Sequence, residues 1–152
     1  MKLDPDLKEF IELLNKHEVR YLIVGGYAVA IHGHPRYTKD IDIWIDRVPD
    51  NAQRIIQVLK DFGFGALGLK AEDFLEIEQI IQLGYPPNRI DILTSPDGVE
   101  FDVCYPIRLE SEVDGITIKF IDLENLKKNK QASGRSQDLA DLDNLGVSGV
   151  ND

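Results

Sequence analysis

The chain has 152 residues, of which 43% are hydrophobic and 29% are charged, a composition typical of a globular protein. Twenty-seven acidic residues against 17 basic ones give a formal net charge of -10, which disfavours a broad surface for binding nucleic-acid backbones. The single cysteine, Cys104, excludes an internal disulfide and any cysteine-built metal site, and it favours a reducing cytoplasm. We expect neither a signal peptide nor a membrane span, because the first residues are of mixed polarity.

The first predicted elements are a helix, a buried strand and a short helix. Apolar residues at helical spacing predict a helix over 5–17, and the continuous apolar run 21–24 indicates a strand that is buried on both faces. Gly25 and Gly26 end this strand, and a helix is expected over 27–32. Glycines before a helix leave backbone N–H groups open to a phosphate, although a tight turn would explain them equally well.

The second predicted strand carries two aspartates one residue apart. Side chains alternate between the faces of a strand, so Asp40, Asp42 and Trp44 share one face and the isoleucines between them share the other. Two adjacent carboxylates repel each other unless water screens them or a cation lies between them. A hard divalent cation with oxygen ligands fits this position.

The middle of the chain is predicted to add one long helix and two strands. The expected elements are a helix over 51–62, a glycine-rich loop over 62–68, a helical turn over 71–75, and strands over 76–83 and 89–93. The last of these strands carries Asp91. If it lies beside the Asp40 strand, Asp91 supplies a third carboxylate to the same site.

The last third of the chain is predicted to hold a hairpin and two helices. Two strands meet at Gly115, the second over 116–120, and they are followed by a helix from 122, a helix over 136–145 and a frayed tail over 146–152. Leu139, Leu142 and Leu145 are expected to face inward. The pattern predicts one α/β (α+β) domain over residues 1–152, with a small mixed sheet and helices packed against one face.

Four short patterns together resemble the nucleotidyltransferase superfamily, whose members share a polymerase-beta-like core. They are Gly25-Gly26 after a strand, Arg36-x-Thr38-x-Asp40-Ile41-Asp42, Ile90-Asp91-Ile92, and Lys130-x4-Arg135-x2-Asp138-x2-Asp141. The last is similar to the end of a small bacterial branch that includes the nucleotidyltransferase-type proteins of toxin–antitoxin systems.

The resemblance implies a role for each matched residue. Asp40, Asp42 and Asp91 would be the catalytic acids and would bind one or two magnesium ions. The implied nucleotide-binding residues are Gly25, Gly26, Tyr27, Arg36, Thr38, Lys39, Lys130 and Arg135. Tyr27 stands where many members of the superfamily have a serine.

The implied activity is a magnesium-dependent transfer of a nucleoside monophosphate from a nucleoside triphosphate such as ATP to a hydroxyl group. The acceptor is open: a small molecule, a protein side chain or an RNA end. An alternative of another class is a catalytically weak or inactive binding module with the same fold, such as the antitoxin of a toxin–antitoxin pair, which Tyr27 slightly favours. The acceptor could be bound across a homodimer or supplied by a protein partner.

Overall fold

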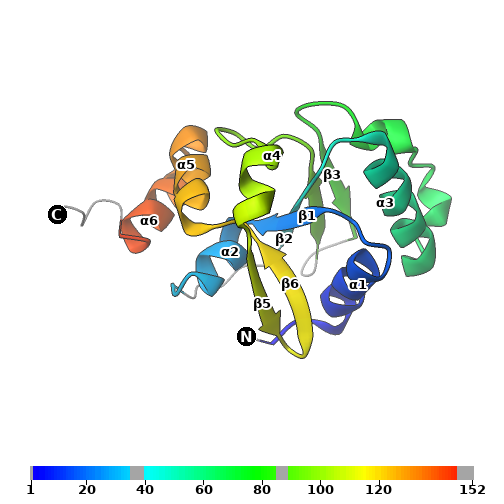
Figure 1. The fold of residues 1–152 in the computed structure, drawn as a ribbon, viewed down its shortest axis with the longest axis horizontal. Coiled ribbons are helices and arrows are strands. Elements are labelled where there is room, and N and C mark those ends of the chain that lie inside the picture. Colours follow the sequence, from blue (N-terminus) through cyan, green and yellow to red (C-terminus); the bar gives the residue numbers. More distant parts are fainter. Residues whose placement is uncertain (1, 35–39, 85–88, 147–152) are drawn as a thin grey trace.

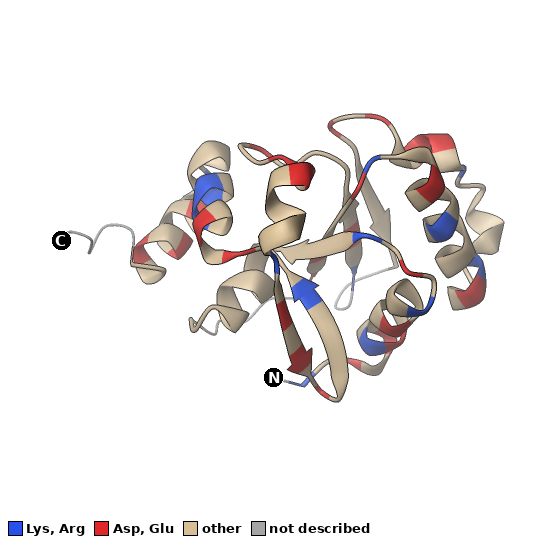
Figure 2. Cartoon of the chain, in the orientation of Figure 1, with Lys and Arg blue, Asp and Glu red and all other residues tan. Residues whose placement is uncertain are grey.

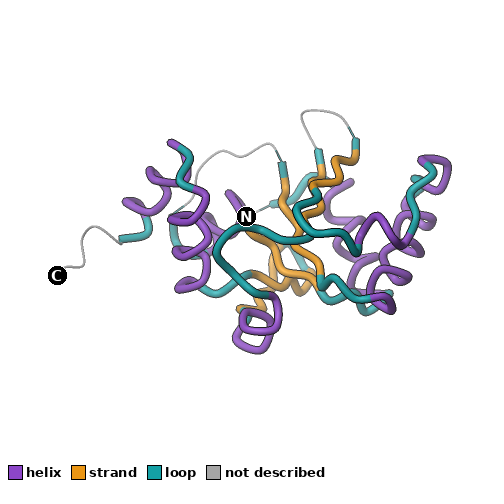
Figure 3. Tube along the Cα trace, turned by 90° about the horizontal axis from the view of Figure 1, so that it is seen from above, coloured by secondary structure: helices purple, strands orange, loops and turns teal. Residues whose placement is uncertain are grey.

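The computed structural model describes residues 2–34, 40–84 and 89–146. Its centre is a six-stranded mixed sheet with the strand order β3-β4-β2-β1-β6-β5. Helices flank the strands on both sides, with α1 and α3 at one end of the view and α2, α5 and α6 at the other (Figure 1, Figure 3). The predicted mixed α/β fold is confirmed, but the helices do not keep to a single face as expected.

The elements follow one another as α1, β1, α2, β2, α3, β3, β4, α4, β5, β6, α5 and α6. The strands are β1 Tyr21–Val24, β2 Ile41–Ile45, β3 Ile80–Leu83, β4 Ile90–Leu93, β5 Leu109–Val113 and β6 Ile116–Phe120. The α-helices are α1 Pro5–Lys16, α2 Gly25–Ile31, α3 Pro49–Phe62, α4 Phe101–Cys104, α5 Leu123–Ser133 and α6 Ser136–Asn144. Three 3-10 turns are η1 Gly65–Leu67, η2 Ala71–Phe74 and η3 Tyr105–Ile107. No helix within the described ranges is long and apolar enough to cross a membrane.

The pairing of β1, β2 and β4 positions the site. β1 runs antiparallel to β2, with Val24 paired to Asp42, and β2 runs parallel to β4, with Asp42 paired to Asp91. The predicted adjacency of the two aspartate strands is therefore confirmed. All four residues of β1 are buried, as expected for the strand at the centre of the core.

Three local predictions differ from the structure. The strand predicted over 76–83 begins only at Ile80, since Glu78 has a φ of 56°, which does not fit a strand. The short helix α4 was not predicted, although its Phe101 packs edge-on against Trp44 with ring centroids 5.2 Å apart. Leu139 is 50% exposed rather than inward, because the adjacent Asp138 takes the buried position.

Charged residues of both signs are interspersed over the described chain rather than gathered on one basic face (Figure 2). Cys104 is buried and unpaired, and burial raises the pKa of its thiol to about 11. The thiol is therefore protonated at neutral pH and behaves as a small apolar group.

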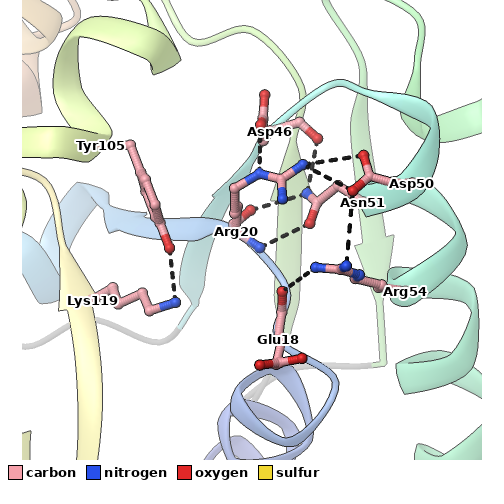
Figure 4. A network of polar contacts seen from close by, with 8 residues as sticks. All are labelled: Glu18, Arg20, Asp46, Asp50, Asn51, Arg54, Tyr105 and Lys119. Atoms are coloured by element: carbon pink, nitrogen blue, oxygen red, sulfur yellow. Dashed lines mark hydrogen bonds and ion pairs between the residues drawn. The ribbon is translucent and has the colours of Figure 1, made fainter.

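A buried asparagine joins helix α3 to the ends of β1 and β2 (Figure 4). The Asn51 side chain accepts a hydrogen bond from Arg20 N at 2.8 Å and donates to Arg20 O at 3.1 Å and to Asp46 O at 2.9 Å. Asn51 is fully buried, so water could not take over its hydrogen bonds to these backbone groups if the side chain were removed.

Replacing Asn51 by alanine is expected to lower the free energy of unfolding by about 2 kcal/mol, because it leaves buried backbone groups of Arg20 and Asp46 unpaired. Urea unfolding followed by circular dichroism measures the change. Gln53→Ala, at an exposed position of the same helix, is the control and should change stability by less than about 0.5 kcal/mol. Equal effects of the two substitutions would contradict this role for Asn51.

Candidate active site

A cleft of about 860 Å³ opens beside the carboxyl end of β1 and the start of β2 and β4. It brings together residues that lie more than a hundred positions apart in the sequence. The predicted site residues that line it are Gly25, Gly26, Asp40, Asp42, Asp91, Lys130 and Arg135. Arg89 and Asp138 line it as well.

The three acids reach the cleft through strand alternation and register. Asp42 lies beside Asp91 because β2 and β4 are parallel and these residues are partners, and Asp40 stands just before β2. Burial, with the neighbouring carboxylate of Asp91, raises the pKa of Asp42 to about 7. Among the described residues, no hydrogen-bond donor contacts the carboxylate of Asp42. Of the three acids, Asp42 is thus the one whose negative charge a bound cation would stabilise most.

Gly25 is required by the close approach of Asp42. Its φ is +67°, and a Cβ at this position would collide with Oδ2 of Asp42 and lie 3.0 Å from its Cγ. Any other residue would therefore displace the carboxylate as well as strain the backbone. Helix α2 begins at Gly25 itself, so the two glycines form its first turn and do not precede it as predicted.

Arg89 is a residue of the cleft that the sequence analysis did not assign to the site. Its Nε donates to Asp91 Oδ1 at 3.0 Å, and its Nη2 donates to Asp40 Oδ2 at 2.8 Å and to Asp91 Oδ2 at 3.3 Å. The hydrogen bond to Asp91 raises the pKa of Arg89 above its ordinary value, so the guanidinium stays charged. Its position two residues before Asp91 on the same strand face was the signal that could have identified it.

A buried ion-pair cluster around Lys130 also borders the cleft. Lys130, 4% exposed, places Nζ 3.1 Å from Asp138 Oδ1 and 3.0 Å from Asp141 Oδ2. Asp138 also accepts hydrogen bonds from Ser133 Oγ at 2.6 Å and from Arg135 Nε at 2.8 Å. Burial opposes ionisation of Asp138, but these donors outweigh it and hold its pKa at about 2. Asp138 and Asp141 are therefore partners of the basic residues and not surface acids of helix α6.

The carboxylate oxygens of this cleft suit a hard divalent ion such as magnesium. As the side chains stand, however, no three Asp, Glu, His or Cys residues of the described chain form a group that could hold a metal ion. The guanidinium of Arg89 binds oxygens of Asp40 and Asp91 in this arrangement. The residues fit a cation by their chemistry, and the carboxylate of Asp42 has no hydrogen-bond donor on it among the residues that the structure describes.

Of the other predicted nucleotide-binding residues, the structure describes Tyr27 and not the three that follow it in the predicted set. Tyr27 packs against the hydrophobic core, and it is not one of the described residues that line the cleft. Arg36, Thr38 and Lys39 lie outside the described residues. Their roles stay predictions.

Comparison with solved structures shows that this fold is that of the nucleotidyltransferases. The lincosamide antibiotic adenylyltransferase LnuA, solved with lincomycin bound, is similar with a TM-score of 0.59 and 20% identity, covering 95% of this chain and 96% of that one. A putative nucleotidyltransferase of Thermotoga maritima has a TM-score of 0.61 at 17% identity, covering 90% and 88%. ANT(2'')-Ia in complex with adenylyl-2''-tobramycin is similar with a TM-score of 0.59 and 11% identity, covering 93% of this chain and 86% of that one.

The sequence comparison then gives the family. Over residues 2–152 the chain matches the family described as nucleotidyltransferase of unknown function, DUF6036, and it belongs to that family. A search of curated protein sequences found no significant match. The resemblance to the nucleotidyltransferase superfamily, drawn from the short motifs, is confirmed.

The raised pKa of Asp42 predicts that stability of the metal-free protein depends on pH. Its pKa of about 7 lies above the ordinary value of 3.8, so ionisation of Asp42 destabilises the fold as pH rises from about 4 to 7. Asp42→Asn removes this charge and is expected to raise the free energy of unfolding by about 2 kcal/mol at pH 8 and by almost nothing at pH 4. Urea unfolding in EDTA at the two pH values measures this.

The exposed Asp143→Asn is the matched control for this comparison and should show no such pH dependence. A gain from Asp42→Asn that is the same at pH 4 and pH 8 would show that the charge of Asp42 is not its cause.

Lys130→Met is expected to cost about 3–5 kcal/mol of stability, since it leaves Asp138 and Asp141 buried without their shared cation. Chemical unfolding at pH 7 is the measurement. Lys128→Met, at an exposed position two residues earlier in the same helix, should cost less than about 0.5 kcal/mol. A loss at Lys130 no larger than this control would contradict the buried ion pairs.

Proposed function

We propose that this protein is a magnesium-dependent enzyme that transfers a nucleoside monophosphate from a nucleoside triphosphate to a hydroxyl group of a small molecule, with pyrophosphate as the leaving group. The observation that carries the proposal is the pairing of Asp42 with Asp91 in register beside Gly25, in a cleft that also holds Lys130 and Arg135. The family to which the chain belongs supports the reaction class.

The acids would divide the work of the metal site. Asp40, Asp42 and Asp91 would hold one or two magnesium ions through their carboxylate oxygens. When bound, magnesium supplies charge neutralisation at the triphosphate and lowers the pKa of the attacking hydroxyl. Asp91 would orient the acceptor by accepting a hydrogen bond from its hydroxyl group on a carboxylate oxygen.

The basic residues would serve the phosphates in two different ways. Lys130 is held by Asp138 and Asp141 and would act as a fixed charge in the wall. The Arg135 side chain is 79% exposed and could turn its planar fork toward phosphate oxygens. Gly25 and Gly26 present no side chain, so the triphosphate could approach the backbone there. Arg36, Thr38 and Lys39 remain expected phosphate contacts from the sequence.

A small acceptor and ATP as donor are supported by the structural neighbours. LnuA is a lincosamide adenylyltransferase, and ANT(2'')-Ia was solved with an adenylylated antibiotic. A cleft of about 860 Å³ has room for a ligand of this size. A protein side chain, an RNA end and the inactive binding module are the alternatives predicted from the sequence.

Incubation with magnesium and each nucleoside triphosphate labelled at the α-phosphorus, with a panel of hydroxyl-bearing small molecules, tests the proposal. We expect label on an acceptor, with Asp42→Ala and Asp91→Ala each reducing transfer by roughly 100-fold or more. Asp143→Asn is the control and should transfer at the native rate. Transfer that survives in the two alanine variants would overturn the proposed site, and label on protein or RNA alone would overturn the small acceptor.

A further inference from the structure

Arg89 occupies the carboxylates that the proposed metal site needs. Its guanidinium contacts both oxygens of Asp91 and one oxygen of Asp40. A magnesium ion binds carboxylate oxygens at about 2.0–2.1 Å, so on these oxygens it would take lone pairs that the hydrogen bonds of Arg89 use and would stand close to the positive guanidinium. The two cations therefore compete for Asp40 and Asp91.

We propose that Arg89 is the internal counter-cation of the metal-free site, and that a divalent ion displaces its side chain from Asp40 and Asp91. The inference rests on the proposed function, because it takes these aspartates as metal ligands. It assigns Arg89 as a positioning residue that holds the acids together until the ion arrives and keeps their charges from repelling one another.

The surroundings of Arg89 allow its side chain to leave while its backbone stays. The carbonyl oxygen of Arg89 accepts a hydrogen bond from Ile41 N at 3.2 Å, which ties the main chain to the start of β2. The side chains of Arg89 and Asp40 are 29% and 31% exposed, so the ion pair faces the open cleft and not the core. Exchange thus needs only rotation of a flexible side chain into solvent.

The burial of Asp91 explains why the metal-free site needs a positively charged neighbour. Asp91 is only 9% exposed in its side chain and lies beside Asp42, so it needs a positive neighbour whenever the metal is absent. Lys130 cannot serve, because its Nζ is engaged by Asp138 and Asp141. Arg89 is the cation that contacts Asp91 among the described residues, and two carboxylates keep it there.

Nuclear magnetic resonance of the arginine Nε–Hε groups in the native protein tests the exchange directly. The Arg89 signal, assigned by its absence in Arg89→Lys, should show slow exchange with water in EDTA. On addition of magnesium it should shift and lose this protection while the backbone amides of Asp42 and Asp91 also shift. An Arg89 signal that stays protected while those amides shift would overturn the exchange and leave the proposed metal site intact.

A lack of any magnesium effect on the amides of Asp42 and Asp91 would instead overturn both the exchange and the proposed metal site. The two failures are therefore distinguishable in one titration.

Metal affinity without nucleotide gives a second test, with Mn²⁺ as the probe and paramagnetic resonance as the readout. Arg89→Gln removes the competitor and should tighten Mn²⁺ binding about tenfold. Arg47→Gln removes the same charge from an exposed side chain that is not among the described residues lining the cleft, and it should change Mn²⁺ affinity about twofold or less. Equal changes in the two variants would show a general charge effect and overturn the exchange.

Thermal unfolding separates this role from a purely structural ion pair. Arg89→Gln should lower the unfolding midpoint in EDTA, and saturating magnesium should close most of the gap to the native protein. A gap of the same size in EDTA and in magnesium would mean that Arg89 keeps its contacts when the metal is bound, and the proposal would fail.

Discussion

The parallel pairing of β2 with β4 in a single register is the constraint on which the site depends. It places Asp42 beside Asp91, whereas a slip of one residue would turn one of these carboxylates into the core. The register is fixed by burial of the intervening residues, since Ile41, Ile43 and Ile92 are almost fully excluded from solvent. The apolar side of the two strands thus determines where the charged side stands.

Charge balance explains much of what surrounds these strands. Three carboxylates at one end of a sheet repel one another, and basic side chains from two separate segments of the chain offset this repulsion. Arg89 directly precedes β4, whereas Lys130 lies in α5 and Arg135 directly precedes α6, and both of these pair with Asp138. Asp42 is left with the least compensation, which is the property that a cation-binding acid needs.

The similar structures share between 11% and 20% of their residues with this chain, so the likeness extends to the fold and not to the details of a site. The chemistry of the cleft is therefore argued from the residues of this chain. In this chain Gly25 lies close against Asp42, and Arg89 pairs with Asp40 and Asp91. The proposed function rests on these contacts and not on the likeness of fold alone.

The sequence by itself determined the order of the main helices and strands and the face shared by Asp40 and Asp42, because periodicity and alternation are local properties of the chain. It also indicated Asp91 as the third acid. Only the tertiary structure decided that Arg89 binds Asp40 and Asp91, that Lys130 is buried between Asp138 and Asp141, and that Leu139 faces solvent instead. These outcomes depend on which charges meet across the sheet and between helices. Arg89 meets Asp40 from a neighbouring strand, and Lys130 in α5 meets Asp138 and Asp141 in α6, so the periodicity of a single element does not determine these contacts.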